Sequence, residues 1–177
     1  MHQGNLKSLE VNIQSVRWPS TVHPSLGGHA EYIMRVFNPH KGRLVAATLE
    51  NTPDVRRLKS NRRLKKALRA WLTDPAHFKA IDEGTAVLPE RFLAKRSDSV
   101  TPRGLARLAN RPFRQLFRPA DFDKVDFSSG RFVKSPAVLL RRLDGRTCAG
   151  CHQSRSVAGF HMLGDDPPTM KVDALAH

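Results

Sequence analysis

The sequence of 177 residues is poor in cysteine and aromatic residues and has no long apolar run. With only two cysteines, a framework of several disulfides is excluded. No stretch of about 18 apolar residues occurs, so no transmembrane helix is encoded. The first residues, Met1–Leu6, have no apolar core of the kind found in secretory signal peptides. Neither a phosphate-binding glycine loop nor a GxSxG nucleophile elbow is present.

The sequence contains fewer acidic residues than basic ones. Thirty Lys and Arg residues stand against 16 Asp and Glu residues, which gives a formal net charge of +14. The excess is concentrated between Val55 and Trp71, where eight basic residues occur and no acidic one. A basic surface of this kind attracts an acidic protein, anionic lipid head groups or nucleic acid.

The first third of the sequence has the pattern of β-strands. Apolar and polar residues alternate from Leu9 to Trp18, which is strand spacing. A second β-rich run covers Glu31 to Phe37, and a third covers Leu44 to Leu49. Glycine and proline separate these runs, so we expect a short antiparallel meander that ends near Thr52.

Four helices are predicted after the meander, because a capping residue precedes a proline four times. The cap side chain accepts an otherwise unpaired backbone N–H, and proline lacks the N–H that would go unused at the first helical position. These starts are Thr52-Pro53, Asp74-Pro75, Thr101-Pro102 and Ser135-Pro136. In the first helix an apolar face is formed by Leu64, Leu68, Trp71 and Leu72.

We therefore predict an α+β fold of three segments in one compact domain. A β-rich segment occupies residues 1–52, a basic helical segment residues 53–146, and a segment with the chemistry described next residues 147–177.

Both cysteines lie in one motif, Cys148-Ala149-Gly150-Cys151-His152. Two thiols at this spacing can bond the two vinyl groups of one haem, and the histidine that follows is then placed to bind the iron. The segment from Thr147 to Gln153 resembles the haem-attachment segment of c-type cytochromes. The resemblance implies a covalently bound haem c, with Cys148 and Cys151 as thioether anchors and His152 as the proximal iron ligand.

The sixth iron ligand has three candidates: His161, Met162 and Met170. We expect His161, because imidazole is the stronger-field ligand and two histidines suit a low potential. Met170 follows a proline-rich stretch, and a thioether there would raise the potential. An open sixth position would instead favour a peroxidase-like haem enzyme.

The haem interpretation predicts electron transfer in the periplasm or on a membrane face. The partner would be an acidic redox protein or an anionic membrane surface, with nucleic acid less favoured. Bacteria attach c-type haem outside the cytoplasm, so we expect the sequence to be a fragment of a longer exported protein.

The alternative is a basic zinc-site protein that binds nucleic acid or another acidic partner. Zinc would take Cys148, Cys151, His152 and His161, a nitrogen and sulfur set that suits this ion. The isoelectric point near 10.9 agrees with this alternative. Against it, the basic residues are spread over several predicted helices and are not gathered beside the cysteines.

Overall fold

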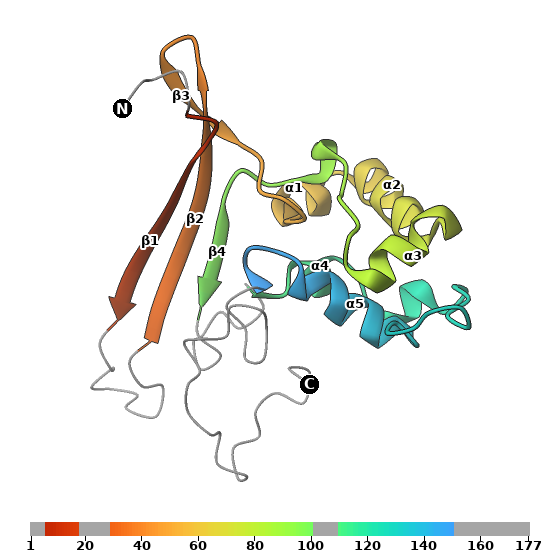
Figure 1. Ribbon diagram of the computed structural model, residues 1–177. Helices are drawn as coiled ribbons and strands as arrows, with labels where there is room; N and C mark the ends of the chain where they lie inside the picture. Colours follow the sequence, from red (N-terminus) through yellow and green to blue (C-terminus); the bar gives the residue numbers. More distant parts are fainter. Residues whose placement is uncertain (1–5, 18–28, 101–109, 151–177) are drawn as a thin grey trace.

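A computed structural model of the chain describes residues 6–17, 29–100 and 110–150 (Figure 1). The predicted helix after Thr101 lies outside these ranges. The same holds for five predicted site residues, namely Cys151, His152, His161, Met162 and Met170.

The first three strands form the predicted antiparallel meander. β1 (Leu9–Arg17) pairs with β2 (His29–His40), and β2 pairs with β3 (Arg43–Ala47). A fourth strand, β4 (Ser97–Val100), also pairs antiparallel with β2 and was not predicted. The long strand β2 is therefore the centre of the sheet.

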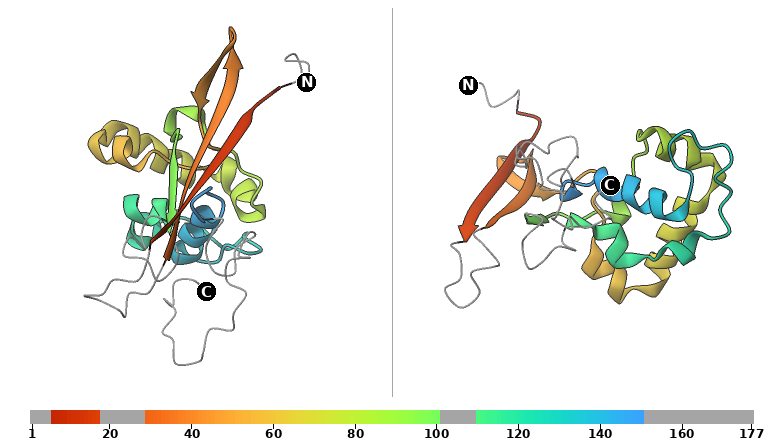
Figure 2. Two further views of the ribbon diagram at one scale, coloured as in Figure 1. Left: turned by 90° about the vertical axis from the view of Figure 1, so that its left-hand side faces the viewer. Right: turned by 90° about the horizontal axis from the view of Figure 1, so that it is seen from below.

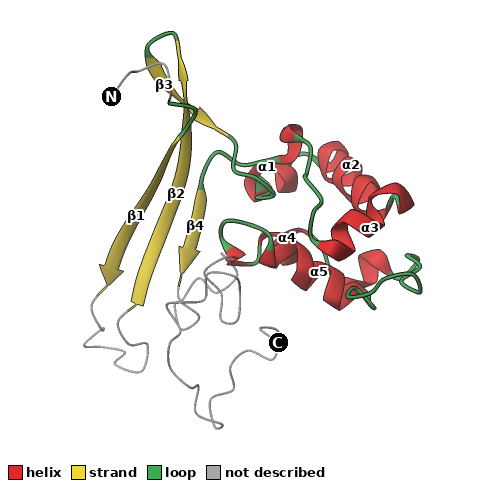
Figure 3. Ribbon diagram, viewed as in Figure 1, coloured by secondary structure: helices red, strands yellow, loops and turns green. Residues whose placement is uncertain are grey.

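Five α-helices lie in the described ranges: α1 (Val55–Ser60), α2 (Arg62–Thr73), α3 (Pro75–Glu83), α4 (Pro112–Leu116) and α5 (Pro136–Gly145). Two short 3-10 helices accompany them, η3 (Glu90–Phe92) and η5 (Pro119–Phe122). The expected α+β fold is confirmed (Figure 3).

Two of the predicted helix starts are confirmed by their hydrogen bonds. The Asp74 carboxylate accepts the N–H of Ala76 at 2.9 Å at the start of α3. The Ser135 hydroxyl accepts the N–H of Val138 at 3.4 Å at the start of α5. In both helices a proline occupies the first turn, where no backbone donor is needed.

The start predicted at Thr52-Pro53 is wrong by two residues. Asp54 is the true cap, since its carboxylate accepts the N–H of Arg57 at 3.0 Å. Pro53 instead forms an isolated β-bridge with Leu93. The hydroxyl of Thr52 has another partner, described with the site below.

The predicted first helix is also divided in two at Asn61. This residue has φ −115° and ψ 92°, which are extended values, and its side chain accepts the N–H of Leu64 at 2.9 Å. Asparagine competes with the helix by hydrogen-bonding nearby backbone, so it ends α1 and caps α2 in one step.

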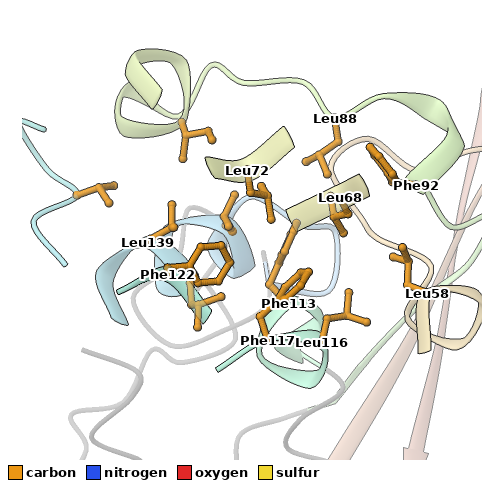
Figure 4. Packing of buried hydrophobic residues seen from close by; sticks show 14 of the residues in the cluster. Leu58, Leu68, Leu72, Leu88, Phe92, Phe113, Leu116, Phe117, Phe122 and Leu139 are labelled. Atoms are coloured by element: carbon orange, nitrogen blue, oxygen red, sulfur yellow. The ribbon is translucent and has the colours of Figure 1, made fainter. Parts of the chain in front are cut away.

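The hydrophobic core belongs to the helices and the loops between them (Figure 4). The predicted apolar face of α2 is confirmed, because Leu68 and Leu72 are buried and Leu64 and Trp71 pack against the same cluster. Phe113 of α4 is fully buried among them. Each fully buried leucine or phenylalanine contributes about 1.5–3 kcal/mol.

The sheet lies to one side of the helices, and β4 is the strand nearest to them (Figure 2). Tyr32 of β2 pairs with Ser99 of β4, and both are buried. Because successive side chains of a strand alternate between faces, their sequence neighbours lie on the opposite face of the sheet. That face carries exposed apolar side chains, namely Leu9, Ile13 and Leu44.

Candidate functional site

The first half of the cysteine motif forms a tight turn directly after α5. The Thr147 hydroxyl donates to the carbonyl of Asp144 at 2.7 Å and accepts the N–H of Gly150 at 2.8 Å. The backbone N–H of Thr147 also donates to the Asp144 carbonyl, at 3.1 Å. One hydroxyl thus joins the end of α5 to the third residue of the motif.

Gly150 is required by this turn. A Cβ atom at this position would lie 1.8 Å from the carbonyl oxygen of Asp144, which no side chain can tolerate. At Gly145, the last residue of α5, an added Cβ would meet nothing within 4 Å. The shape of this turn therefore explains why the motif has glycine at position 150.

Three hydroxyl groups hold three consecutive residues of the motif. The Thr52 hydroxyl accepts the N–H of Cys148 at 3.0 Å. The Ser99 hydroxyl donates to the carbonyl of Ala149 at 3.3 Å. Thr147 completes the set at Gly150, as described above. We call Thr52, Ser99 and Thr147 the hydroxyl clamp.

The clamp holds the backbone of Cys148, Ala149 and Gly150, and its three hydrogen bonds are made with backbone groups of these residues. Cys148 is half-buried, and its thiol is not part of a disulfide. The two long-range members come from the β3–α1 connection and from β4, 96 and 50 residues from their partners in sequence. The turn is thus held between the sheet and the helices.

A buried carboxylate, Asp144, ties the same turn to α4. Its Oδ1 accepts the N–H of Phe113 at 2.7 Å, and the Nε of Arg114 lies 3.5 Å from its Oδ2. Burial raises the pKa of Asp144 from 3.8 to about 7, against the opposing effects of Phe113, Arg114 and Arg111. Desolvation of the carboxylate therefore outweighs these favourable contacts.

A small cavity of about 170 Å³ lies beside Ala149. The hydroxyl of Ser97 lines it, is buried and has no hydrogen-bond partner among the described residues. Arg96 at its edge is paired with Asp98 at 2.8 Å, so this pair adds no net charge. The cavity is smaller than the usual 300–1,000 Å³ of ligand pockets, so it suits water and excludes a macrocycle.

The basic surface next to the site is formed by α1 and α2. Arg57 donates to the carbonyls of Arg91 and Leu93, and Lys65 lies over the ring of Phe117. Arg57 and Lys65 therefore contact other parts of the chain. The other six basic side chains of the segment are exposed, namely Arg56, Lys59, Arg62, Arg63, Lys66 and Arg69.

We call these six residues the basic surface. It begins close to the motif, because Thr52, three residues before the first residue of α1, contacts Cys148. Within the described part of the chain, no exposed aromatic side chain belongs to α1 or α2, and Phe113 and Phe117 are buried in the core. The surface thus offers charge without stacking platforms.

Among the described residues, no three His, Cys, Asp or Glu side chains come together as ligands of a metal ion. The predicted partners of Cys148, which are Cys151, His152 and His161, lie outside the described ranges. Both the haem ligands and the zinc ligands therefore remain predictions.

In the described half of the motif, Cys148 is half-buried and the close approach at Gly150 leaves no room for a side chain there.

Comparison of the chain with protein-family models, with curated proteins and with solved structures found no match. In the described ranges, no helix combines the length and the apolar character needed to cross a bilayer.

Sequence reasoning missed the hydroxyl clamp and Asp144. Thr147 directly precedes the motif, so a local turn at this residue was the one accessible signal. Thr52 was interpreted as a helix cap, and Ser99 lies in a strand without apolar alternation. No sequence pattern pairs either residue with a cysteine so distant in the chain.

Proposed function

We propose that this chain carries one covalently attached haem and acts in electron transfer. Cys148 and Cys151 form the thioether bonds, and His152 is the proximal ligand of the iron. The observation that carries the proposal is the CxxCH sequence motif, whose first three residues, Cys148 to Gly150, form a turn held by the hydroxyl clamp. When bound, the haem supplies one-electron exchange at the iron.

Residues of the chain would hold the haem and set its redox potential. His152 would hold the iron, and His161 is the proposed second ligand, with Met162 and Met170 as alternatives. Two strong-field ligands keep the iron closed to added substrates and favour electron transfer over peroxidase chemistry. The clamp fixes the turn, so the first thioether anchor has a defined position before attachment.

The basic surface supplies the contact for the partner. Six exposed cations without an acidic neighbour between residues 55 and 73 attract an acidic redox protein and raise its association rate. An anionic membrane surface shares this chemistry and is the second candidate partner. Attachment of c-type haem requires an exported chain, so the proposal includes a periplasmic or other exported location.

The proposal is tested by expressing the chain behind an export leader in a host with haem-attachment machinery. The protein is extracted with acidified acetone, and the pyridine haemochrome spectrum is recorded on the pellet. We expect an α band that survives extraction, at one haem per chain. The native spectrum then distinguishes two histidines, histidine with methionine, and an open sixth position.

The opposite result has a defined meaning. If no haem survives extraction and elemental analysis finds about one zinc per chain, the electron-transfer proposal is overturned. The basic zinc-site alternative then takes its place, with nucleic acid or another acidic molecule as its partner.

Docking is tested by following electron exchange with an acidic redox protein while the salt concentration rises. The double variant Arg62→Glu and Lys66→Glu should slow exchange at low salt and flatten its salt dependence. The double variant Lys41→Glu and Arg43→Glu, at the β2–β3 turn, makes the same change in net charge away from α1 and α2. Equal slowing in both variants would show that only net charge matters.

A further inference from the structure

A hollow of the described structure lies between α2, α3 and the segment 121–129. Its volume is about 760 Å³, and none of its lining residues belongs to the turn that carries Cys148. The volume falls within the range of small-molecule sites, about 300–1,000 Å³. We call this hollow the α2–α3 groove.

We propose that the α2–α3 groove binds a single-chain anionic amphiphile, of which a long-chain fatty acid is the simplest example. The acyl chain lies on the apolar floor, and the carboxylate lies among the cations at the edge. This binding does not depend on the haem, so the amphiphile proposal and the electron-transfer proposal are tested independently.

The floor of the groove is apolar. Leu72 and Phe122 are buried beneath it, and Phe78 and Val125 are half-buried in its walls. The ring of Phe78 is supported by Phe127 in an edge-to-face contact, with 6.0 Å between the ring centres. A fixed apolar floor of this kind favours a hydrocarbon chain over a polar ligand.

The edge of the groove is cationic. Lys66 and Arg69 come from α2, Lys79 from α3 and Lys124 from the opposite wall, and all four are exposed. Lys79 lies 4.0 Å from Glu83, and the other three form no ion pair with a described residue. Several cations are thus available to one anionic head group.

Three carboxylates also line the groove, but each is already used by the backbone. Asp74, Asp121 and Asp126 each accept a backbone N–H, at 2.9, 2.7 and 2.9 Å respectively. These bonds stabilise turns and satisfy the carboxylates locally. With four cations and three carboxylates the groove has a net formal charge of +1, which complements one carboxylate on a ligand.

The test is calorimetric titration of the full chain with dodecanoate, below the concentration at which it self-associates. Dodecan-1-ol serves as the neutral probe of equal length. We expect saturable binding of one dodecanoate per chain, and binding of the alcohol about fivefold weaker or more, because it cannot pair with the cations.

Matched variants place the ligand in the groove. Lys66→Gln with Lys124→Gln should weaken dodecanoate binding about fivefold, whereas Lys59→Gln with Arg63→Gln, outside the groove, should change it less than about twofold. Val125→Asp should reduce binding more than about tenfold, because it places a charge against the acyl chain. Val87→Asp is its control, since Val87 is 62% exposed and does not line the groove.

Three results would overturn the proposal. These are no saturable binding by the folded chain, equal affinity for dodecanoate and dodecan-1-ol, or equal losses in the groove variants and their controls. Circular dichroism is recorded for every variant, and binding is compared only among variants whose spectrum matches that of the parent chain. A loss of binding is then not caused by unfolding.

Discussion

The hydroxyl of Thr52 accepts the backbone N–H of Cys148 at 3.0 Å, across 96 residues of sequence. The same hydroxyl donates to the carbonyl of Glu50 at 3.2 Å, so both of its hydrogen-bonding roles are filled. In Thr52→Val, the N–H of Cys148 and the carbonyl of Glu50 lose this partner. We expect a loss of about 1–3 kcal/mol in the free energy of unfolding, measured by urea denaturation.

The conservative variant separates the hydrogen bond from the packing. Thr52→Ser keeps the hydroxyl and removes one methyl group, so its stability should stay within about 1 kcal/mol of the parent chain. If the proposed haem is attached here, Thr52→Val should also lower the fraction of chains that carry it, and Thr52→Ser should restore it. Equal haem content in all three proteins would contradict a positioning role for Thr52.

Gly150 and Gly145 form a matched pair for the second prediction. Gly150→Ala places a Cβ 1.8 Å from the Asp144 carbonyl, so the turn must open, whereas Gly145→Ala meets nothing. We expect Gly150→Ala to destabilise the chain by about 1–3 kcal/mol. Gly145→Ala should be neutral or slightly stabilising, because alanine is the better helix residue. Thermal unfolding followed by circular dichroism measures both, and similar melting temperatures would contradict the prediction.

Asp144 predicts an unusual pH dependence of stability. Its pKa is raised by burial from 3.8 to about 7, so between these values the folded chain holds a proton that the unfolded chain has lost. Stability should therefore fall as the pH rises from about 4 to about 7 and level off above that. The fall is about 4 kcal/mol at most, from the size of the pKa shift.

Asp144→Asn tests this assignment. Asparagine keeps the shape and an acceptor for the N–H of Phe113 but cannot titrate. Every other titratable group is the same in both proteins, so the difference between the two stability curves reports on Asp144 itself. Parallel curves from pH 4 to pH 7 would show that this carboxyl does not change its protonation there.

A second buried carboxylate, Asp82, behaves in the opposite way. Burial by itself raises the pKa of Asp82, but the N–H groups of Arg131, Phe132 and Val133, together with Arg142, lower it below the usual value. Its contribution is present above pH 4 and lost as the pH falls through the folded pKa. The pH windows of the two aspartates are therefore separate.

Asp82→Ala leaves those three N–H groups without their acceptor, at 2.6–2.8 Å in the parent chain. We expect a loss of roughly 2–4 kcal/mol in the free energy of unfolding, measured in guanidinium chloride. Asp123→Ala, at an exposed position without such bonds among the described residues, should change it by less than about 0.5 kcal/mol. Equal effects would show that the cap on residues 131–133 contributes little.

Local sequence patterns predicted most of the secondary structure. The β meander and the starts of α3 and α5 followed from alternation and from caps before proline, which depend only on near neighbours. Strand β4 could not be predicted, because Ser97, Asp98 and Ser99 have neither the apolar content nor the alternation of a strand. Its conformation comes from pairing with β2, a contact between distant segments.

The candidate site shows the same division. The motif with Cys148 was apparent from spacing alone, whereas the partners of its backbone were not. Thr52 has the sequence features of a helix cap, yet its side chain serves another segment and Asp54 takes the cap. The Thr52 hydroxyl cannot both cap α1 and hold Cys148. The tertiary contact with Cys148, which local sequence does not reveal, determines which of the two it does.

The hydroxyl clamp makes the shape of this turn depend on distant parts of the chain. The bonds from Ser99 to Ala149 and from Thr52 to Cys148 close loops of 50 and 96 residues, and closing long loops costs conformational entropy. We therefore expect the turn to keep this shape only while β4 and the β3–α1 connection are in place, so that local unfolding of either segment would also change the surroundings of Cys148.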